Sequence, residues 1–376
     1  MVNETWENLK RNGQKAFKAK EYEQCLQHWT EALEEAMKAG PENLRVGTSC
    51  VDLAQLHIQL GNYEQAEALL TRALKIREGQ QGPDHLHVAE ALALLARVFI
   101  AMGKAGDAEG LLKRALSIRE KSLGADHPKS SESRRALGNY YSLIGRFNEA
   151  EPLLRQSLTL KESPIAPDNL EVADSLKSFA RVLRKLGKYE EATSYYERAL
   201  NIREKVLGED HLDVAEGLRS LANNYSYQGD YEKAEPLHRR SLEIFEKNLG
   251  ADHPEVATGL HNLAVLYHRT GKYSQAEPLF VRALQLFSSV LGNDHPEVAT
   301  TLVSMALFYE SKGRYEKAES LSRQALAIYE KNYGPEHVNV GMSLRNLANV
   351  CTAQGRHKEA VELKERADKI LGARAR

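Results

Sequence analysis

The chain has 376 residues, of which 42% are hydrophobic and 27% charged, a composition ordinary for a globular protein. Its 51 lysines and arginines against 52 aspartates and glutamates give a net charge of −1, which argues against an overall attraction to nucleic acid or acidic lipid. The most apolar stretch, 92–102, contains Arg97 and is too short to span a bilayer, so no membrane association is expected.

The N-terminal residues and the cysteines both favour a cytoplasmic protein. Residues 1–10 carry Glu4, Glu7 and Lys10 and no apolar core, so they do not resemble a secretory signal. The three cysteines are widely spaced and show neither a disulfide framework nor a zinc-ligand pattern. We therefore expect a reducing compartment, no metal and no cofactor.

Residues 1–39 are predicted to form a short, divergent hairpin that caps the N-terminal end of the fold. Gly13, Tyr22, Trp29 and Ala32 stand at positions that match the later sequence units. We expect Trp29 to fill the large aromatic position of the hairpin core.

The rest of the chain repeats with a period of 42 residues. Eight glycines stand 42 residues apart, and an alanine follows each of them by five residues. A fixed period of this length is typical of a solenoid, in which each unit buries its apolar face against its neighbours. The glycines are Gly61, Gly103, Gly145, Gly187, Gly229, Gly271, Gly313 and Gly355.

One repeat, residues 251–292, shows what each unit is expected to form. Asp252 and Glu255 make a pattern like a capping box, which predicts a helix that runs from there to about Arg269. Gly271 ends this helix, and a second apolar stripe continues to Gly292. No strand-like alternation is found, so each unit is predicted to be a helix–turn–helix hairpin and the fold to be all-α.

The whole chain, 1–376, is predicted to be a single solenoid whose repeats follow one another without insertions. Their predicted bounds are 41–81, 82–124, 125–165, 166–208, 209–250, 251–292, 293–334 and 335–376. Pro164 and Pro167 replace the usual Leu-Gly closure of a repeat, which predicts a hinge or a changed bend at 162–168.

The repeated motifs resemble those of the tetratricopeptide repeat (TPR), in the 42-residue variety found in kinesin light chains. The matching strings are L-G-x-D-H-P-x-V-A, L-x-N-L-A-x-L-Y, G-K-Y-x-x-A-E-P-L and R-A-L, nearly complete in 249–286 and recognisable over 82–376. The resemblance implies a right-handed superhelical solenoid of about nine hairpins that binds other proteins and carries no catalytic residues. Kinesin light chains have a coiled coil before their repeats, and no such heptads precede the repeats in this sequence.

Aspartate–histidine pairs recur at the start of the repeats and could suggest acid–base or metal chemistry. They recur every 42 residues at the same hairpin junction, whereas a catalytic site is singular, so we interpret them as helix caps. The sequence also lacks a nucleophile elbow, a phosphate loop and an HExxH motif, and we expect no enzyme. The pairs are Asp84-His85, Asp126-His127, Asp210-His211, Asp252-His253 and Asp294-His295.

The candidate binding surface is the polar stripe of the first helices, which line the concave face in TPR proteins. In the repeats from 125 to 292 this stripe is rich in lysine and arginine, while its acids, Glu132, Asp174 and Glu216, stand at the helix starts. We therefore expect a basic floor that binds acidic, including acidic-aromatic, peptide segments. The predicted peptide-binding residues are Arg135, Asn139, Lys177, Arg181, Arg184, Arg219, Asn223, Tyr227, His261, Asn262 and Arg269.

Other partners stay open at this point. The solenoid could instead be a structural scaffold or a self-associating subunit that uses its convex face and ends, and its oligomeric state is not encoded in these patterns. RNA binding would need regular paired readers and stacking aromatics, which the stripe lacks beyond Tyr227. A clamp for a C-terminal carboxylate is less favoured than an internal acidic segment, because Thr300 and Ser304 stand where the clamp needs basic residues.

Overall fold

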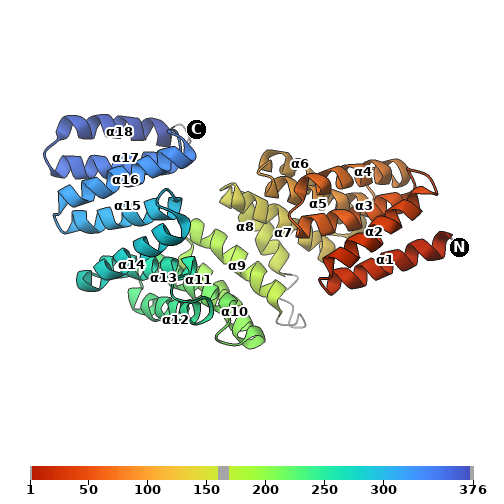
Figure 1. Cartoon of the computed structure of the whole chain (residues 1–376), viewed down its shortest axis with the longest axis horizontal. Coiled ribbons are helices and arrows are strands. Elements are labelled where there is room, and N and C mark those ends of the chain that lie inside the picture. Colours follow the sequence, from red (N-terminus) through yellow and green to blue (C-terminus); the bar gives the residue numbers. More distant parts are fainter. Residues whose placement is uncertain (1, 160–168, 373–376) are drawn as a thin grey trace. The chain divides into compact units, whose positions relative to one another are not determined.

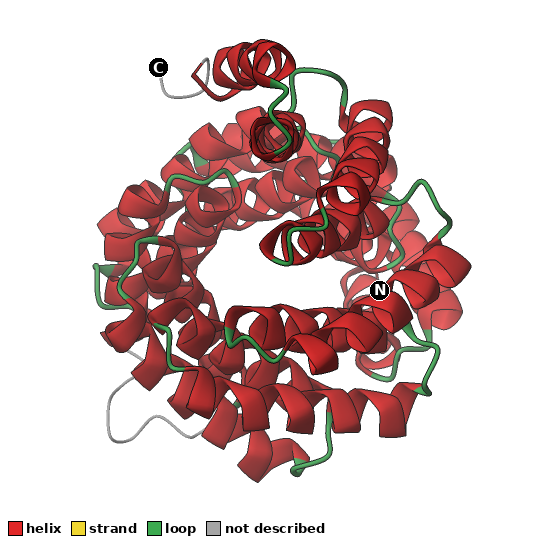
Figure 2. Cartoon of the chain, turned by 90° about the vertical axis from the view of Figure 1, so that its left-hand side faces the viewer, coloured by secondary structure: helices red, strands yellow, loops and turns green. Residues whose placement is uncertain are grey.

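The computed structural model of the chain describes residues 2–159 and 169–372. Within these ranges every regular element is an α-helix, and the helices pair into hairpins as the repeat pattern predicts (Figure 2). The chain divides into two compact units, one made of Met1–Asp168 with Arg181–Leu186 and the other of Asn169–Ala180 with Gly187–Arg376. The predicted hinge at 162–168, with Pro164 and Pro167, lies outside the described residues.

The first unit contains four hairpins, shown in red to yellow in Figure 1. Their helices are α1 (Val2–Lys18), α2 (Tyr22–Met37), α3 (Leu44–Gln59), α4 (Tyr63–Gln81), α5 (Leu86–Ala101), α6 (Ala105–Leu123), α7 (Pro128–Leu143) and α8 (Phe147–Thr159). Helix α9 (Leu170–Lys185) is divided between the units, with its last turns grouped with the first unit.

The second unit contains the remaining helices, shown in green to blue in Figure 1. They are α10 (Tyr189–Leu207), α11 (Leu212–Gln228), α12 (Tyr231–Leu249), α13 (Pro254–Arg269), α14 (Tyr273–Leu291), α15 (Pro296–Ser311), α16 (Tyr315–Tyr333), α17 (Val338–Ala353) and α18 (His357–Gly372). The helix ends of the repeat at 251–292 agree with those predicted from its sequence.

Positive backbone φ angles explain why glycine recurs at the hairpin turns. Gly271, after α13, has φ 72°, and Gly292, after α14, has φ 88°. Residues with a Cβ avoid this left-handed region, whereas glycine enters it without a steric penalty. The 42-residue glycine series therefore marks the turn inside each hairpin.

The helix caps differ from the prediction in one respect: the histidine of each aspartate–histidine pair, not the aspartate, is the N-cap. The His253 Nδ1 accepts a hydrogen bond of 3.1 Å from the Glu255 backbone N–H. The His295 Nδ1 accepts the equivalent bond from Glu297 at 3.2 Å. The aspartate lies one residue too early for this role, and Asp294 instead forms an ion pair with Lys331 at 2.5 Å. The interpretation of the pairs as capping features is confirmed, and the predicted capping residue is wrong.

Small residues set the distance between helices. Ala276 and Ala283 of α14 are fully buried, as is Ala264 of α13. An alanine at each crossing lets the two backbones approach closely while larger side chains interdigitate around it. The alanine series predicted from the sequence therefore lies at the helix interfaces.

The N-terminal hairpin is closed by Trp29, which is 3% exposed and stacks on Phe17 with ring centroids 5.4 Å apart. Its indole Nε1 donates to the Lys10 carbonyl oxygen at 3.3 Å. A Cβ placed on Gly13 would lie 2.2 Å from the Trp29 ring, so only glycine allows this packing. The predicted core role of Trp29 is confirmed.

We expect Gly13→Ala to lower the free energy of unfolding by about 1–3 kcal/mol, because the indole must leave its packed position. Gly110→Ala is the matched control: Gly110 lies inside α6, and an added Cβ would meet nothing within 4 Å. This control should gain about 0.5–1 kcal/mol from helix propensity. Urea titrations followed by circular dichroism measure both, and equal stability of the two variants would contradict the packing argument.

Candidate functional site

The first helices of successive hairpins contact one another in the second unit, α11 with α13, α13 with α15 and α15 with α17. A cavity of about 220 Å³, called here the second-unit cavity, is lined mainly by α11 and α13. Its lining residues are Asn223, Ser226, Tyr227, His238, His261, Asn262, Val265, Leu266, Arg269 and Ser304.

Three polar side chains of this cavity have no protein partner. Within residues 2–159 and 169–372, the side chains of Asn223, Asn262 and Arg269 make neither a hydrogen bond nor an ion pair. Arg269 is exposed at the end of α13, and both asparagines are half-buried. A guanidinium and two amides are thus available to a ligand in one place.

Two histidines form the buried side of the cavity, and both are neutral at physiological pH. Burial lowers the pKa of His238 to about 4, helped by the nearby positive charge of Arg219. Burial alone lowers the pKa of His261 to about 4. The His261 Nδ1 is buried without a hydrogen-bond partner, and its Nε2 lies 3.5 Å from the Ser304 Oγ. The cavity therefore presents imidazole nitrogens without adding charge.

An aromatic ring and an apolar extension flank the cavity. Tyr227 is 54% exposed, and its ring stacks on Tyr189 with centroids 5.9 Å apart. A further cavity of about 670 Å³ shares Arg269 with the second-unit cavity and continues over Leu307 of α15. Burial raises the pKa of the Glu310 carboxyl at this end, because its surroundings solvate a negative charge poorly.

Five of the predicted peptide-binding residues line this one cavity: Asn223, Tyr227, His261, Asn262 and Arg269. Two predicted cations of the second unit are neutralised by neighbouring helices. Lys177 forms an ion pair with Glu216, and Arg219 forms one with Glu255 while lying over the Phe245 ring, 5.1 Å from its centroid. These ion pairs offset part of the positive charge that the two side chains would otherwise offer to a ligand.

The remaining predicted residues belong to α7 and to the last turns of α9. Arg135 and Asn139 are half-buried on α7, and the Asn139 Oδ1 is buried without a hydrogen bond. Arg181 and Arg184 lie in the part of α9 that is grouped with the first unit. A single basic groove through all the predicted residues stays a prediction.

Sequence reasoning missed His238, because it considered only the first helices as lining and His238 belongs to α12. A signal was present in the repeat pattern. The equivalent positions 42 residues away hold Tyr196 and Phe280, both buried, so a histidine there places two polar nitrogens in an aromatic core position. Ser304 was noted only as a missing basic residue, yet it lines the cavity.

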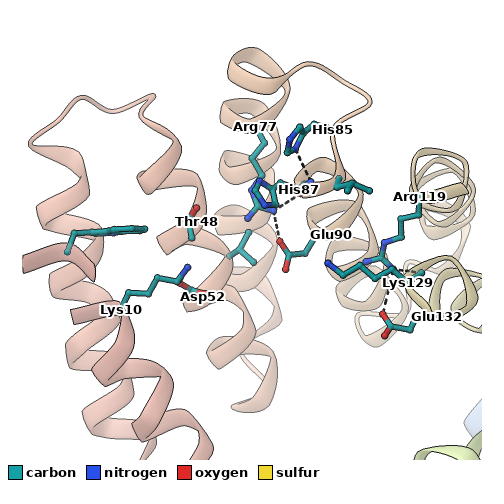
Figure 3. A pocket seen from close by; sticks show the side chains of 13 residues that line it. Lys10, Thr48, Asp52, Arg77, His85, His87, Glu90, Arg119, Lys129 and Glu132 are labelled. Atoms are coloured by element: carbon teal, nitrogen blue, oxygen red, sulfur yellow. Dashed lines mark hydrogen bonds and ion pairs between the residues drawn. The ribbon is translucent and has the colours of Figure 1, made fainter. Parts of the chain in front are cut away.

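The first unit has a cavity of its own, of about 750 Å³, called here the first-unit cavity (Figure 3). Its most unusual side chain is Asp52 of α3, whose Oδ2 is buried and accepts no hydrogen bond. The Lys10 Nζ lies 3.7 Å from this oxygen, which is a charge contact beyond hydrogen-bond length. Burial raises the pKa of Asp52 to about 6, although Lys10 opposes the shift.

Neither metal chemistry nor a membrane span is suggested by the described residues. Within 2–159 and 169–372, histidine, cysteine, aspartate and glutamate side chains form no group of three or more that could hold a metal ion. In the same ranges, no helix combines the length and the apolar character needed to cross a membrane.

The shifted pKa of Asp52 predicts a pH-dependent stability. The folded pKa, about 6, exceeds the ordinary value of 3.8, so the native state binds the proton more tightly and stability falls as pH rises from about 4 to about 6. Asp52→Asn removes this penalty and should raise the free energy of unfolding at pH 7 by about 1–3 kcal/mol. Urea titrations at pH 7 and pH 4.5 measure it. A gain of the same size at both values would contradict the titration.

Comparison with known proteins gives the family. Residues 9–79, 48–121, 87–163, 171–247, 218–289, 255–330 and 297–371 match the model of the tetratricopeptide repeat. Among curated protein sequences, none matches the chain significantly.

Two solved structures with TM-scores above 0.5 are similar in fold, and a third aligns with part of the chain. The apo form of RapI has a TM-score of 0.70 at 16% identity, over 98% of this chain and 97% of that chain. Aspartyl phosphate phosphatase F from Bacillus subtilis has a TM-score of 0.60 at 14% identity, over 98% of this chain and 92% of that chain. A putative kinesin light chain from Podosopora anserina has a TM-score of 0.48 at 26% identity, over 56% of this chain and 98% of that chain.

The family matches cover most of the chain, and the 42-residue hairpins, the turn glycines and the interface alanines agree with them. The protein therefore belongs to the tetratricopeptide repeat family.

Proposed function

We propose that the protein is a non-enzymatic adaptor whose second-unit cavity binds extended peptide segments with acidic side chains, including acidic-aromatic segments. Tetratricopeptide repeat proteins mediate protein–protein interactions, so a protein partner is expected from the family. The observation that carries the proposal is the convergence of Asn223, Asn262 and Arg269, all without a partner among the described residues, on one cavity.

The two asparagines suit the backbone of an extended peptide. A carboxamide carries a carbonyl acceptor and an amino donor. Each asparagine can therefore accept a hydrogen bond from a peptide N–H and donate one to a peptide carbonyl oxygen. Asn223 lies on α11 and Asn262 on α13, two helices in direct contact. A peptide that crosses both helices would therefore be held at two points along its backbone, whatever its side chains.

Arg269 supplies the preference for an acid. Its guanidinium is exposed and has no carboxylate partner among the described residues, so binding a ligand carboxylate breaks no existing ion pair. Arginine holds a carboxylate through two parallel hydrogen bonds, which adds geometric specificity to charge attraction. The neutral histidines His238 and His261 leave this guanidinium as the cation of the cavity lining.

The apolar extension suits a hydrophobic side chain next to the acidic one. Leu307 is 39% exposed there, and Tyr227 offers a ring face at the opposite end. The half-buried carboxyl of Glu310 disfavours a second ligand acid at the extension, since its own charge is already poorly solvated. Affinity in the micromolar range, about −8 kcal/mol, is expected for an interface of this size.

The cysteines are consistent with an intracellular adaptor. Cys25, Cys50 and Cys351 are all free and buried. Free thiols persist in reducing compartments, which supports the cytoplasm as the place where the protein acts.

Arg269→Ala should weaken binding of acidic peptides by about tenfold or more, because a charge-assisted hydrogen-bond pair is lost. The probes are acetylated, amidated peptides with glutamate at one position and the same peptides with glutamine there. Fluorescence anisotropy with the whole chain, at low and high salt, measures the affinity. Arg282→Ala is the matched control. Arg282 of α14 belongs to the same repeat but does not line the cavity, and it forms an ion pair with Glu246 at 3.0 Å.

Asn262→Ala should weaken glutamate and glutamine peptides alike, because the amide acts on the backbone. Equal binding of both peptides by the unmodified protein, or equal loss in Arg269→Ala and Arg282→Ala, would refute the acidic preference. If no peptide binds while light scattering shows a mass that grows with concentration, the scaffold interpretation replaces the adaptor.

A further inference from the structure

The first-unit cavity brings together side chains of both charges from several helices. Trp6 and Lys10 come from α1, Asp52 from α3, and further charged residues from α4 to α7 (Figure 3). The complete lining is Trp6, Lys10, Thr48, Val51, Asp52, Arg77, His85, Leu86, His87, Glu90, Arg119, Lys129 and Glu132. Which of these charges are already satisfied decides what the cavity can bind.

Both arginines link neighbouring helices, and each lies near a glutamate. Arg77 is 4% exposed and donates to the His87 carbonyl oxygen at 2.5 Å and to Glu90 at 3.0 Å. Arg119 donates to the Lys129 carbonyl oxygen at 3.1 Å and to the Ser133 hydroxyl at 2.9 Å. Each arginine thus already has a carboxylate nearby that offsets its charge, Glu90 at 3.0 Å from Arg77 and Glu132 at 3.9 Å from Arg119.

The Asp52 carboxylate forms only a loose ion pair with Lys10, and Lys129 forms no ion pair within the described ranges. The Asp52 Oδ2 is buried without a hydrogen bond, with Lys10 3.7 Å away. The Lys129 ammonium is exposed and forms no ion pair within the described ranges. Figure 3 shows Asp52 on one side of the Arg77–Glu90 pair and Lys129 on the other. The loosely paired Asp52 and the unpaired Lys129 are thus separated by the Arg77–Glu90 pair.

We propose that the first-unit cavity binds a peptide segment that carries one basic and one acidic side chain, with the basic group on Asp52 and the acidic group on Lys129.

An arginine side chain fits the Asp52 end. Its guanidinium supplies the N–H donors that Oδ2 lacks, in a fork that matches a carboxylate. The half-buried Trp6 ring lines the same end and offers apolar surface to the methylene stem. Lys10, which already lies 5.5 Å from the Trp6 ring centroid, can follow its flexible stem toward solvent when the guanidinium binds.

The size of the cavity supports a peptide segment. A volume of about 750 Å³ falls within the range of about 300–1,000 Å³ typical of ligand pockets. Its lining residues come from α1 and from α3 to α7, so several helices can contact one bound segment. The inference does not depend on the second-unit cavity, because no residue is shared between the two.

Tryptophan fluorescence reports binding directly. The chain has two tryptophans, Trp6 in the cavity lining and Trp29 in the N-terminal hairpin core, 3% exposed. A guanidinium that reaches Asp52 changes the surroundings of Trp6 and leaves Trp29 unchanged. Trp6→Phe therefore abolishes the signal without removing the charged groups of the site.

The test titrates the whole chain with acetylated, amidated peptides that hold one arginine and one glutamate, in both orders, separated by one to four glycines. In companion peptides, neutral citrulline replaces the arginine or glutamine replaces the glutamate. We expect the doubly charged peptide to bind about tenfold or more tightly than either companion.

Two variants assign the ends of the site. Asp52→Asn should abolish the preference for arginine over citrulline and keep the preference for glutamate over glutamine. Lys129→Ala should abolish the preference for glutamate over glutamine and keep the preference for arginine over citrulline. Asp84→Asn and Lys121→Ala, exposed residues of the same unit outside the lining, should change neither preference. An Asp52→Asn protein that still prefers arginine, or a purely acidic peptide that binds as well as the doubly charged one, would overturn the inference. Circular dichroism verifies the fold of each variant.

Discussion

The structure depends on one repeated bridge between successive hairpins, in which a glutamate of a second helix binds the end of the next first helix. Glu235 of α12 accepts from the Tyr267 hydroxyl at 2.9 Å and from the Lys272 ammonium at 2.7 Å. These hydrogen bonds, led by the one from Lys272, lower the pKa of Glu235. Tyr267 belongs to the last turn of α13 and Lys272 to the turn that follows it, so the bridge joins α12 to the C-terminal end of α13. Equivalent bridges join Glu109 with Tyr141 and Arg146, and Glu277 with Tyr309 and Lys312.

Because the bridge recurs at the repeat period, the polar stripe of each first helix occupies a defined place next to the preceding one. That is why spacing alone predicted the hairpins and brought Asn223, Asn262 and Arg269 into one candidate site. The turns need a residue with positive φ and the helix crossings need a small side chain, so glycine and alanine recur at fixed positions and a sequence period reveals them directly. The N-cap was misassigned because Asp252 and His253 are adjacent and both accept hydrogen bonds, so the choice between them depends on one residue of helix phase.

What the sequence does not predict is how charges are used once the helices are packed. From the sequence, Lys177 and Arg219 are expected to be unpaired cations. In the structure each forms an ion pair with a glutamate from the first helix of a neighbouring repeat. Asp52 reads as an ordinary polar residue of a helix, yet packing leaves one of its oxygens buried with no donor. Both outcomes depend on side-chain directions between residues 36 to 42 positions apart, which a single period does not encode.

One position of the repeat changes from charged to apolar along the chain. In the early repeats the second helix places an arginine beside an acidic residue of a first helix, as in Arg77 with Glu90 and Arg203 with Asp174. At the same position 42 and 84 residues after Arg203 stand the buried rings of Phe245 and Phe287, and threonine replaces the acid at 258 and 300. A buried arginine needs a carboxylate, which brings both charges to the first-helix face, whereas a buried phenylalanine needs none. The first-unit cavity is lined by two such arginine–glutamate pairs together with Asp52 and Lys129, whereas the second-unit cavity is lined by neutral amides and imidazoles around one arginine.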